Sequence, residues 1–439
     1  MLALTLIAIA AAVGHDLNRR GLPIVLPSPP LLAYWNPHLG WGTPLALLCV
    51  LTGVHLQRLT PTLTWRRLLL AGWLLSLAWM ISLTLVDGLQ RGWVEVLLNP
   101  NEYLYDLPRI TDPAAFLVTF TDYIAFGDSV AGTTVWTTHV AGHPPLATLV
   151  FWVLARIGLD GGFWAGALCI LVGSTVSVAL PVAVCELGAS AAARRLVPFV
   201  ALFPGAVWMA VSADGLFAGV AVSGLALVCI GAARRRLLAS LAGGVLLGIA
   251  VFLSYGLILF GLVALLPFVL TVRRRGRGAS LAPWSVAAAG VVAVAAVHAG
   301  FGFHWLTGLA QLRIRYYQGI AASRPFSYFV YANFAAWLIS CSPLLAVGIS
   351  RAFGVLRRGG RMSWSPDHVV ALLALSGVGA ALVADVSALS KAETERIWLA
   401  FGAIAYAGLA LLRGRGASWA LVGCGASALL VNHLFDTGW

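Results

Sequence analysis

The chain has 439 residues, of which 60% are hydrophobic and 10% are charged, and its mean hydropathy is +0.91. Too few polar residues are present to cover a soluble protein of this length, so the composition indicates a polytopic membrane protein. The net charge of +12 comes from short basic clusters between apolar segments. This pattern is typical of cytoplasmic loops and excludes a nucleic-acid partner as its explanation.

Six cysteines lie inside apolar segments, and none has the spacing of a zinc site or a disulfide framework. They are expected to pack as small core residues. The abundance of Ala, Gly and Arg is typical of a multi-pass protein of the bacterial plasma (inner) membrane. The six are Cys49, Cys169, Cys185, Cys229, Cys341 and Cys424.

The N-terminal residues 1–13 are apolar but short for a crossing, which takes roughly 20 helical residues. They form either a signal peptide or a shortened first helix that the charged residues after them close. Residues 22–43 are rich in Pro and Trp and predict a loop that rests at the membrane interface.

A second apolar segment, 44–57, is followed by basic residues that we expect in the cytoplasm: Arg58, Arg66 and Arg67. Residues 68–86 then form a helix that leads outward. Asp87, the next residue, is therefore expected on the outer face.

Residues 87–145 form the one long polar segment of the chain and hold seven acidic residues against two arginines, in a chain that is basic overall. We expect this external segment to carry the chemistry, on the extracytoplasmic face. It ends with His139 and His143. The acids are Asp87, Glu95, Glu102, Asp106, Asp112, Asp122 and Asp128, and the arginines are Arg91 and Arg109.

The remaining apolar segments predict helices separated by two shorter external loops, 302–325 and 387–396. Residues 144–157 are short and open with two prolines, so we expect a half-inserted helix that returns outward. The whole chain, 1–439, is expected to be a single all-α transmembrane bundle of roughly 11–14 helices, with juxtamembrane helices in the long first external loop. The predicted helical ranges are 163–186, 196–210, 215–232, 237–272 as a pair that turns near 254–256, 285–301, 326–349, 368–386, 397–412 and 417–434.

Asp87 follows the end of a predicted helix, where a rigid element would hold its carboxylate as a general base for an acceptor hydroxyl. The alternative is that it only marks the membrane boundary. Glu102, beside Tyr103, is the rival carboxylate.

The tetrad His143-Pro144-Pro145-Leu146 resembles the His-Pro-Pro-Leu signature that closes the first external loop of protein O-mannosyltransferases, and the related Pro-Pro-Leu of aminoarabinose transferases. Both belong to the GT-C superfamily of integral membrane glycosyltransferases. The order of segments is also similar, including Asp214 after Leu-Phe-Pro. The resemblance implies a GT-C type fold with Asp87 as the catalytic base. Those families usually have an Asp-Glu pair where this chain has Asp87-Gly88, which keeps Glu102 as the alternative base.

Three arginines of the external loop 302–325 run against the positive-inside trend: Arg313, Arg315 and Arg324, with Tyr316 beside them. Guanidinium groups can hold phosphate oxygens bidentately, so these residues predict a site for the phosphate of a lipid-linked donor. The alternative is an interfacial belt of Arg and Tyr that contacts ordinary phospholipid.

Residues 390–398 resemble a Glu-Arg-Ile-Trp stretch found in GT-C membrane transferases of actinobacteria. Arg396, at the head of the next inward helix, is expected to reach the same phosphate. The alternative is an ion pair with Glu393 or Glu395.

Four other residues, His139, His143, Tyr103 and Asp214, are expected to position the loop or the substrate. The two histidines have no third ligand at a suitable spacing, so no metal site is predicted, and no cofactor is indicated. Asp214 either assists the base or caps the helix that follows it, and capping is the more common role.

Two functions follow from this pattern. The first is an inverting glycosyltransferase that uses a polyprenyl-phosphate sugar, such as a mannosyl or arabinosyl donor, and a glycan, glycolipid or protein acceptor in the cell envelope. The sequence contains no fingerprint for binding a nucleotide sugar. This absence is expected if the sugar donor is linked to a lipid. The second is a secondary transporter or a lipid flippase. The crowding of acids in one external segment, with spans that are nearly free of charge, favours the enzyme.

Overall fold

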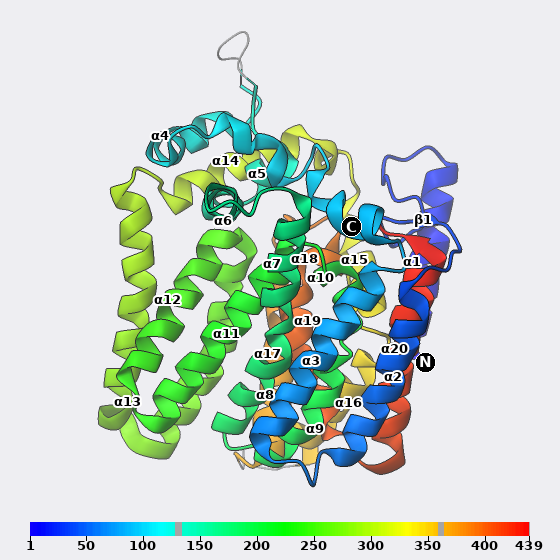
Figure 1. Ribbon diagram of the computed structural model, residues 1–439, viewed down its shortest axis with the longest axis vertical. Helices are drawn as coiled ribbons and strands as arrows, with labels where there is room; N and C mark the ends of the chain where they lie inside the picture. The colour runs from blue at the N-terminus through cyan, green and yellow to red at the C-terminus, as the bar shows by residue number, and fades with distance from the viewer. Residues whose placement is uncertain (128–133, 359–363, 439) are drawn as a thin grey trace.

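The computed structural model describes residues 1–127, 134–358 and 364–438, and Asp128 of the acidic segment lies outside these ranges. The chain is almost wholly helical (Figure 1). The longer helices are α1 (Leu2–Arg19), α2 (Gly42–Leu59), α3 (Trp65–Thr84), α7 (Gly162–Ser174), α8 (Val176–Glu186), α9 (Ser190–Ala201), α11 (Ala213–Arg234), α12 (Leu237–Leu253), α13 (Phe260–Gly300), α14 (Trp305–Gln318), α15 (Phe326–Ser340), α16 (Leu345–Arg358), α17 (Pro366–Val386) and α20 (Gly414–Leu434).

Short helices and one small sheet complete the fold. The short α-helices are α4 (Pro113–Thr119), α5 (Thr138–Gly142), α6 (Leu146–Arg156), α10 (Ala206–Met209), α18 (Thr394–Ile397) and α19 (Leu399–Ala405). Tighter or wider turns are η1 (Gln90–Val94), η2 (Val96–Leu98), η3 (Tyr103–Arg109), η4 (Phe120–Tyr123), η5 (Tyr255–Leu259), η6 (Ile320–Ala322) and η7 (Tyr406–Leu411). Strands β1 (Tyr34–Trp35) and β2 (Phe435–Asp436) pair antiparallel and join the N-terminal loop to the C-terminal segment.

Within the described ranges, eight helices are long and apolar enough to cross a membrane, or nine if the bent pair α15 and α16 is one span. The kink at Gly276 divides α13 into two of these. The predicted all-α polytopic bundle is therefore confirmed. The number of apolar helices in the described ranges reaches the predicted 11–14 only when the bent pair and three shorter apolar segments are also counted. These segments are α6, α12, and α19 with η7.

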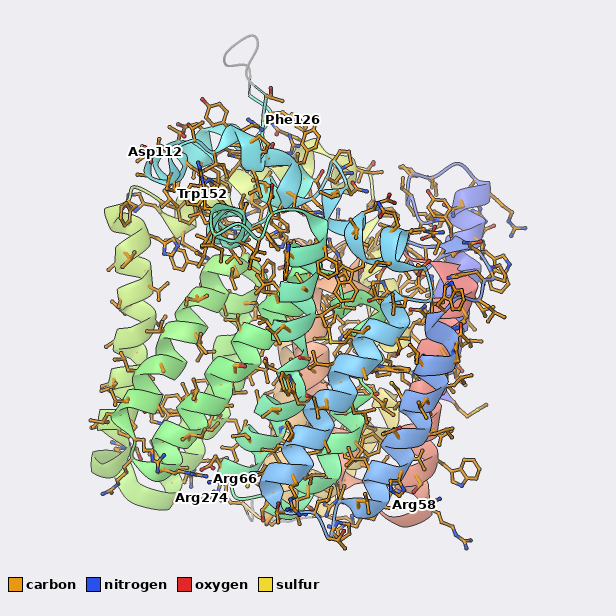
Figure 2. All side chains as sticks on the ribbon, viewed as in Figure 1. Arg58, Arg66, Asp112, Phe126, Trp152 and Arg274 are labelled. Atoms are coloured by element: carbon orange, nitrogen blue, oxygen red, sulfur yellow. The ribbon has the colours of Figure 1, made fainter. Side chains whose placement is uncertain are left out.

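The two ends of the bundle differ in charge and structure (Figure 2). Arg58, Arg66 and Arg274 lie at one end, which we call the arginine end. Asp112, Phe126 and Trp152 lie at the opposite end, which we call the loop end. The acidic segment and α14 are both at the loop end (Figure 1).

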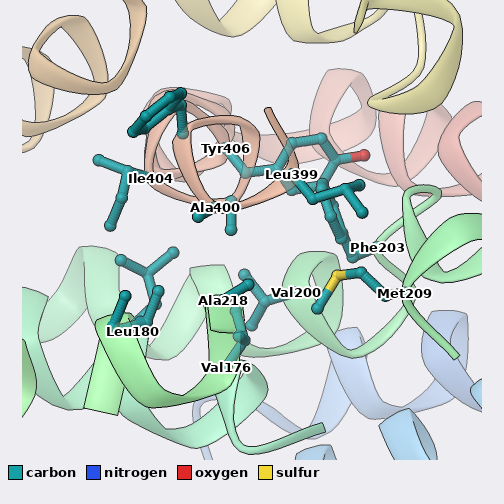
Figure 3. Close-up of a cluster of buried hydrophobic side chains, with 14 of the residues drawn as sticks. Val176, Leu180, Val200, Phe203, Met209, Ala218, Leu399, Ala400, Ile404 and Tyr406 are labelled. Carbon is teal, nitrogen blue, oxygen red and sulfur yellow. The ribbon is translucent and has the colours of Figure 1, made fainter. Parts of the chain in front are cut away.

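The core packs α8, α9 and α11 against α19 (Figure 3). Leu180, Phe203 and Ile404 are among its buried side chains. Small residues let neighbouring backbones approach closely, as is usual between membrane helices. At Gly244 of α12, a Cβ would lie 1.9 Å from the carbonyl oxygen of Ala287 in α13, so only glycine fits there.

Two predicted segments differ in the structure. The predicted loop 302–325 is largely helical, since α14 occupies Trp305–Gln318. The single helix predicted over 326–349 is broken, because α15 and α16 meet at an angle of 104° around Ser342-Pro343, and Ser342 has a φ of 68°. A proline there ends regular helical hydrogen bonding. Residues 144–157 give the 11-residue helix α6, which lies at the loop end (Figure 1).

Candidate functional site

Four residues from distant parts of the chain form one hydrogen-bonded network. The Nδ1 of His139 lies 2.9 Å from Oε1 of Glu102, and the other ring nitrogen, Nε2, lies 3.0 Å from Nη2 of Arg396. The Nη1 of Arg396 lies 2.9 Å from Oδ2 of Asp214. Glu393 adds a second carboxylate, 3.1 Å from Nη2 of Arg396. We call Glu102, His139, Asp214 and Arg396 the buried ionic network.

Local structure fixes each member of this network. Ser212 caps α11 and accepts a hydrogen bond from the Asp214 N–H, which holds the aspartate in the first helical turn. The His139 N–H donates to the carbonyl of Asn101, beside Glu102. Arg396 follows a backbone in which Ala392 and Glu393 both have positive φ, a conformation that costs energy in residues other than glycine.

Burial and charge lock the buried ionic network. Its four side chains are each more than nine-tenths buried. Burial alone would raise the pKa of Glu102, but its interactions with His139 and then with Arg396 outweigh burial and lower that pKa. Burial opposes the charge on Arg396, yet Asp214, Glu393 and Glu102 together raise its pKa. Glu102 and Arg396 are therefore held in their charged forms by their partners.

His143 and Tyr103 close one side of the network. His143 Nδ1 lies 2.9 Å from the carbonyl oxygen of His139, and burial lowers the pKa of His143 to about 4. The Tyr103 ring lies 5.7 Å from the His143 ring and 6.1 Å from the His139 ring. At neutral pH His143 is thus an uncharged ring that is fixed in place, which suits a positioning residue better than a proton acceptor.

Asp87 belongs to a second polar cluster. Its Oδ1 lies 3.3 Å from His38 Nε2 and 3.6 Å from Arg91 Nη2, and Arg91 also contacts Asp436 of β2. The Asp87 side chain is 25% exposed and lines a hollow of about 500 Å³ with Trp41. Burial raises its pKa, although His38 and Arg91 partly offset this effect.

One short segment separates the two clusters. Val207, Ala210 and Val211 line a small cavity beside Asp87. Asp214, three residues after Val211, holds Arg396. The predicted convergence of carboxylates and arginines is therefore divided: Glu102 and Asp214 meet Arg396, whereas the ionic contacts of Asp87 are with other residues.

The arginines of the predicted phosphate site differ in their contacts. Arg313 is exposed on α14. The Arg315 guanidinium lies 3.3 Å from the centre of the Phe126 ring, and its buried Nη1 has no hydrogen-bond partner within the described ranges. Arg324 donates its Nε to the carbonyl of Ile24 and its Nη1 to the carbonyl of Lys391. Those nitrogens of Arg324 hold the loop, a geometry that does not favour phosphate binding.

The loop 387–396 rests on contacts that the sequence did not suggest. Asn333 of α15 donates to Asp385 at 2.7 Å and to the carbonyl of Ser390 at 2.6 Å. The Tyr316 hydroxyl accepts the Lys391 N–H at 2.7 Å and thereby joins α14 to this loop. A lone Asn in an apolar segment was the one available signal for this anchor.

The partners of Asp87 were missed for another reason. His38 lies 49 positions before Asp87, and Asp436, which pairs with Arg91 rather than with Asp87 itself, lies 349 positions after it. No spacing rule relates positions so far apart. The pairing of β1 with β2, and the hydrogen bonds from the Asn36 and His38 N–H groups to the carbonyls of Leu434 and His433, bring these segments together. Among the described residues, no group of three His, Cys, Asp or Glu side chains is arranged to hold a metal ion.

The environment of Glu395 should make the stability of the protein depend on pH. It is fully buried, its Oε1 accepts the Leu32 N–H, and burial is the main cause that raises its pKa to about 7 from the ordinary 4.5. The folded chain thus keeps a proton that the unfolded chain loses between pH 4.5 and 7. The free energy of unfolding should fall as pH rises through this window.

Glu395→Gln keeps the acceptor and stays neutral, so it should remove this fall. The variant is expected to match the wild type near pH 4.5 and to be more stable at pH 8 by about 3 kcal/mol, at about 1.4 kcal/mol per pKa unit. Thermal unfolding in detergent at both pH values measures the difference. An equal change at both values would contradict the assignment.

No protein-family model matches the sequence, and no curated protein matches it. Solved structures that it matches include the oligosaccharyltransferase of Archaeoglobus fulgidus in complex with zinc and sulfate, with 15% identity and a TM-score of 0.44 over 87% of this chain and 53% of that one. The same protein tethered to an acceptor peptide with the NVT sequon gives 14% identity and a TM-score of 0.40 over 84% and 49%. This chain spans about half the length of these proteins.

Proposed function

We propose that this protein is a membrane glycosyltransferase of the GT-C type that transfers a sugar from a polyprenyl-phosphate donor to an acceptor hydroxyl. The observation that carries the proposal is the buried ionic network. It joins the acidic segment, the residues before His-Pro-Pro-Leu, Asp214 and the Glu-Arg-Ile-Trp stretch. These are the segments on which the sequence resemblance rests.

Asp87 is the proposed general base. It is the more accessible of the two candidate carboxylates, and its raised pKa makes it the stronger base. It would take the proton of the acceptor hydroxyl while that oxygen attacks the anomeric carbon from the face opposite the phosphate. The bond from that carbon to the phosphate oxygen breaks, and the bond's electrons leave with polyprenyl phosphate. One displacement inverts the anomeric centre.

Glu102 then has a positioning role rather than that of the base. Its Oε1 is paired with His139 and its side chain is 4% exposed, so an acceptor hydroxyl has little access to it. Through His139 and Arg396 it helps to hold Asp214, and thus the start of α11 beside the Asp87 cavity.

The donor phosphate is proposed to bind at Arg315, with Arg313 of the same helix nearby in sequence. The buried Nη1 of Arg315 has no partner among the described residues, so a phosphate oxygen would satisfy it. At an effective dielectric near 20, one such pair at about 4 Å contributes on the order of 4 kcal/mol. This attraction would also stabilise the phosphate as it leaves.

A lipid-linked donor accounts for a chain that is mostly membrane helices. The arginine end is the cytoplasmic side by the positive-inside rule, so the loop end would face the extracytoplasmic side. The acceptor is a glycan, a glycolipid or a protein. The transporter alternative is less favoured, because the broken span has no charged residue at its break, Cys341 to Leu344.

Membranes with and without the protein should be incubated with radiolabelled polyprenyl-phosphate mannose and, separately, polyprenyl-phosphate arabinose. We expect label to enter an acceptor fraction with one of these donors only when the protein is present. If, for each donor, the acceptor fraction takes up the same amount of label in membranes with and without the protein, the proposal is contradicted for these two sugars.

Arg315→Gln is expected to weaken donor use by about tenfold or more, because hydrogen bonds to a charged group contribute about 1.5–3 kcal/mol. The effect should appear in KM for the donor, and KM for the acceptor should be unchanged. Arg19→Gln is the matched control, since Arg19 is exposed and its only ionic contact in the described chain is with Asp16. An unchanged donor KM in the Arg315 variant would remove this residue from the site.

A further inference from the structure

A large groove lies at the bend between α15 and α16, away from the proposed catalytic residues. It has a volume of about 1510 Å³, which exceeds the roughly 300–1,000 Å³ of most small-molecule sites. Its walls come from the first turns of α1, the end of α15, one side of α16 and parts of α17 and α20. The groove lies where α15 and α16 meet at an angle of 104°.

The groove has two chemically different parts. Most of its lining is apolar and includes Leu2, Leu338 and Val347. The remaining part carries the exposed arginines of α16: Arg351, Arg357 and Arg358. No acidic residue lines the groove, and within the described ranges none forms an ion pair with these arginines.

The charged part lies at the arginine end of the bundle. Arg358 precedes α17, which begins at Pro366 and runs to Val386, just before the loop 387–396. Trp364 lies 5.8 Å from the Arg273 guanidinium, next to Arg274, which Figure 2 labels at the arginine end. Arg351, Arg357 and Arg358 are thus separated from the loop-end site by the length of α17.

We propose that this groove binds one anionic glycerophospholipid of the leaflet at the arginine end. The acyl chains occupy the apolar part, and the headgroup phosphate contacts the arginines of α16. Basic pockets between membrane helices on the cytoplasmic side favour anionic headgroups. Apolar walls alone would accept any lipid, so the selectivity for negative charge comes from the three arginines.

The site differs from that of the proposed sugar donor. The donor phosphate would lie at the loop end, near Arg315, so one lipid cannot serve both sites. Loss of the lipid at the groove therefore leaves the chemistry of Asp87 and Arg315 in place, and the two proposals can fail independently.

The test uses the full-length protein, reconstituted with equal amounts of phosphatidylglycerol and phosphatidylcholine and then examined by native mass spectrometry. We expect one phosphatidylglycerol to be retained in preference to phosphatidylcholine. Replacing all three α16 arginines with glutamine should abolish this preference. Each arginine is expected to contribute a factor of about five to the affinity for phosphatidylglycerol relative to phosphatidylcholine. The matched control replaces three other exposed arginines with glutamine and so removes the same charge from the N-terminal part of the chain. These residues are Arg58, Arg66 and Arg67.

A second variant tests the apolar part without changing charge. Ser350→Trp fills space beside the exposed Ser350 and should reduce retention of both lipids. Equal retention of the two lipids by the wild type would overturn the proposal, as would an equal loss of preference in both triple variants. A lipid-free dimer would show that the groove does not retain the proposed lipid, and would also overturn the proposal.

Discussion

Replacing Asp87 with asparagine is expected to reduce sugar transfer by about 10²–10⁴-fold, the usual contribution of a positioned general base. Asparagine keeps the size of the side chain but cannot accept the hydroxyl proton. Stability should change little, because His38 and Arg91 lie 3.3 and 3.6 Å away in a partly exposed site, and such pairs contribute about 1 kcal/mol or less. The measurement is the initial rate of label transfer at saturating donor.

Asp122→Asn provides the matched control. Asp122 is an exposed acid of the same segment, so its loss should leave the rate within about twofold of wild type. Glu102→Gln separates the two candidate bases. If it abolished transfer while Asp87→Asn remained active, Glu102 would be the base and the roles proposed here would be exchanged.

Replacing Arg396 with methionine is expected to have the largest effect on stability. The change leaves Asp214 and Glu102 buried near each other without the cation that holds their charges. Breaking a buried ion pair from one side costs about 3–5 kcal/mol. The melting temperature in detergent should fall clearly, and transfer activity should fall with it.

Arg413→Met is the control for the loss of an arginine. Arg413 pairs with Asp367 at 2.8 Å, but its side chain is 65% exposed, so the expected cost is about 1 kcal/mol or less. Adding Asp214→Asn to Arg396→Met removes one of the stranded charges and should recover part of the stability. Equal melting temperatures for the Arg396 and Arg413 single variants would contradict the description of a buried network.

The fold class follows directly from composition and apolar periodicity, because a membrane bundle needs long uncharged segments. The bend between α15 and α16 does not follow from hydropathy, since the apolar character continues through it. The pair Ser342-Pro343 was the available signal for a break. The helix α14 was missed for the opposite reason: its arginines and tyrosines are typical of a loop, although nothing in them prevents a helix.

The site was predicted in part. Sequence patterns selected Glu102, His139, Asp214 and Arg396, and the structure joins these four. They also grouped Asp87 with Arg396, whereas the structure pairs Asp87 with His38 and Arg91, and Arg91 in turn with Asp436 near the C-terminal end. Motifs report which residues are chemically unusual, but pairing across hundreds of positions depends on tertiary contacts that no local pattern encodes.

Transfer itself is tested most directly with purified protein in proteoliposomes that contain the lipid-linked sugar donor selected by the membrane assay and its acceptor. Mass spectrometry would follow the glycosylated acceptor and free polyprenyl phosphate together. If the protein is a glycosyltransferase, the two products should form in equal amounts, and their formation should require Asp87. Donor that only moves between the leaflets, with neither product formed, would contradict this account and identify a flippase instead.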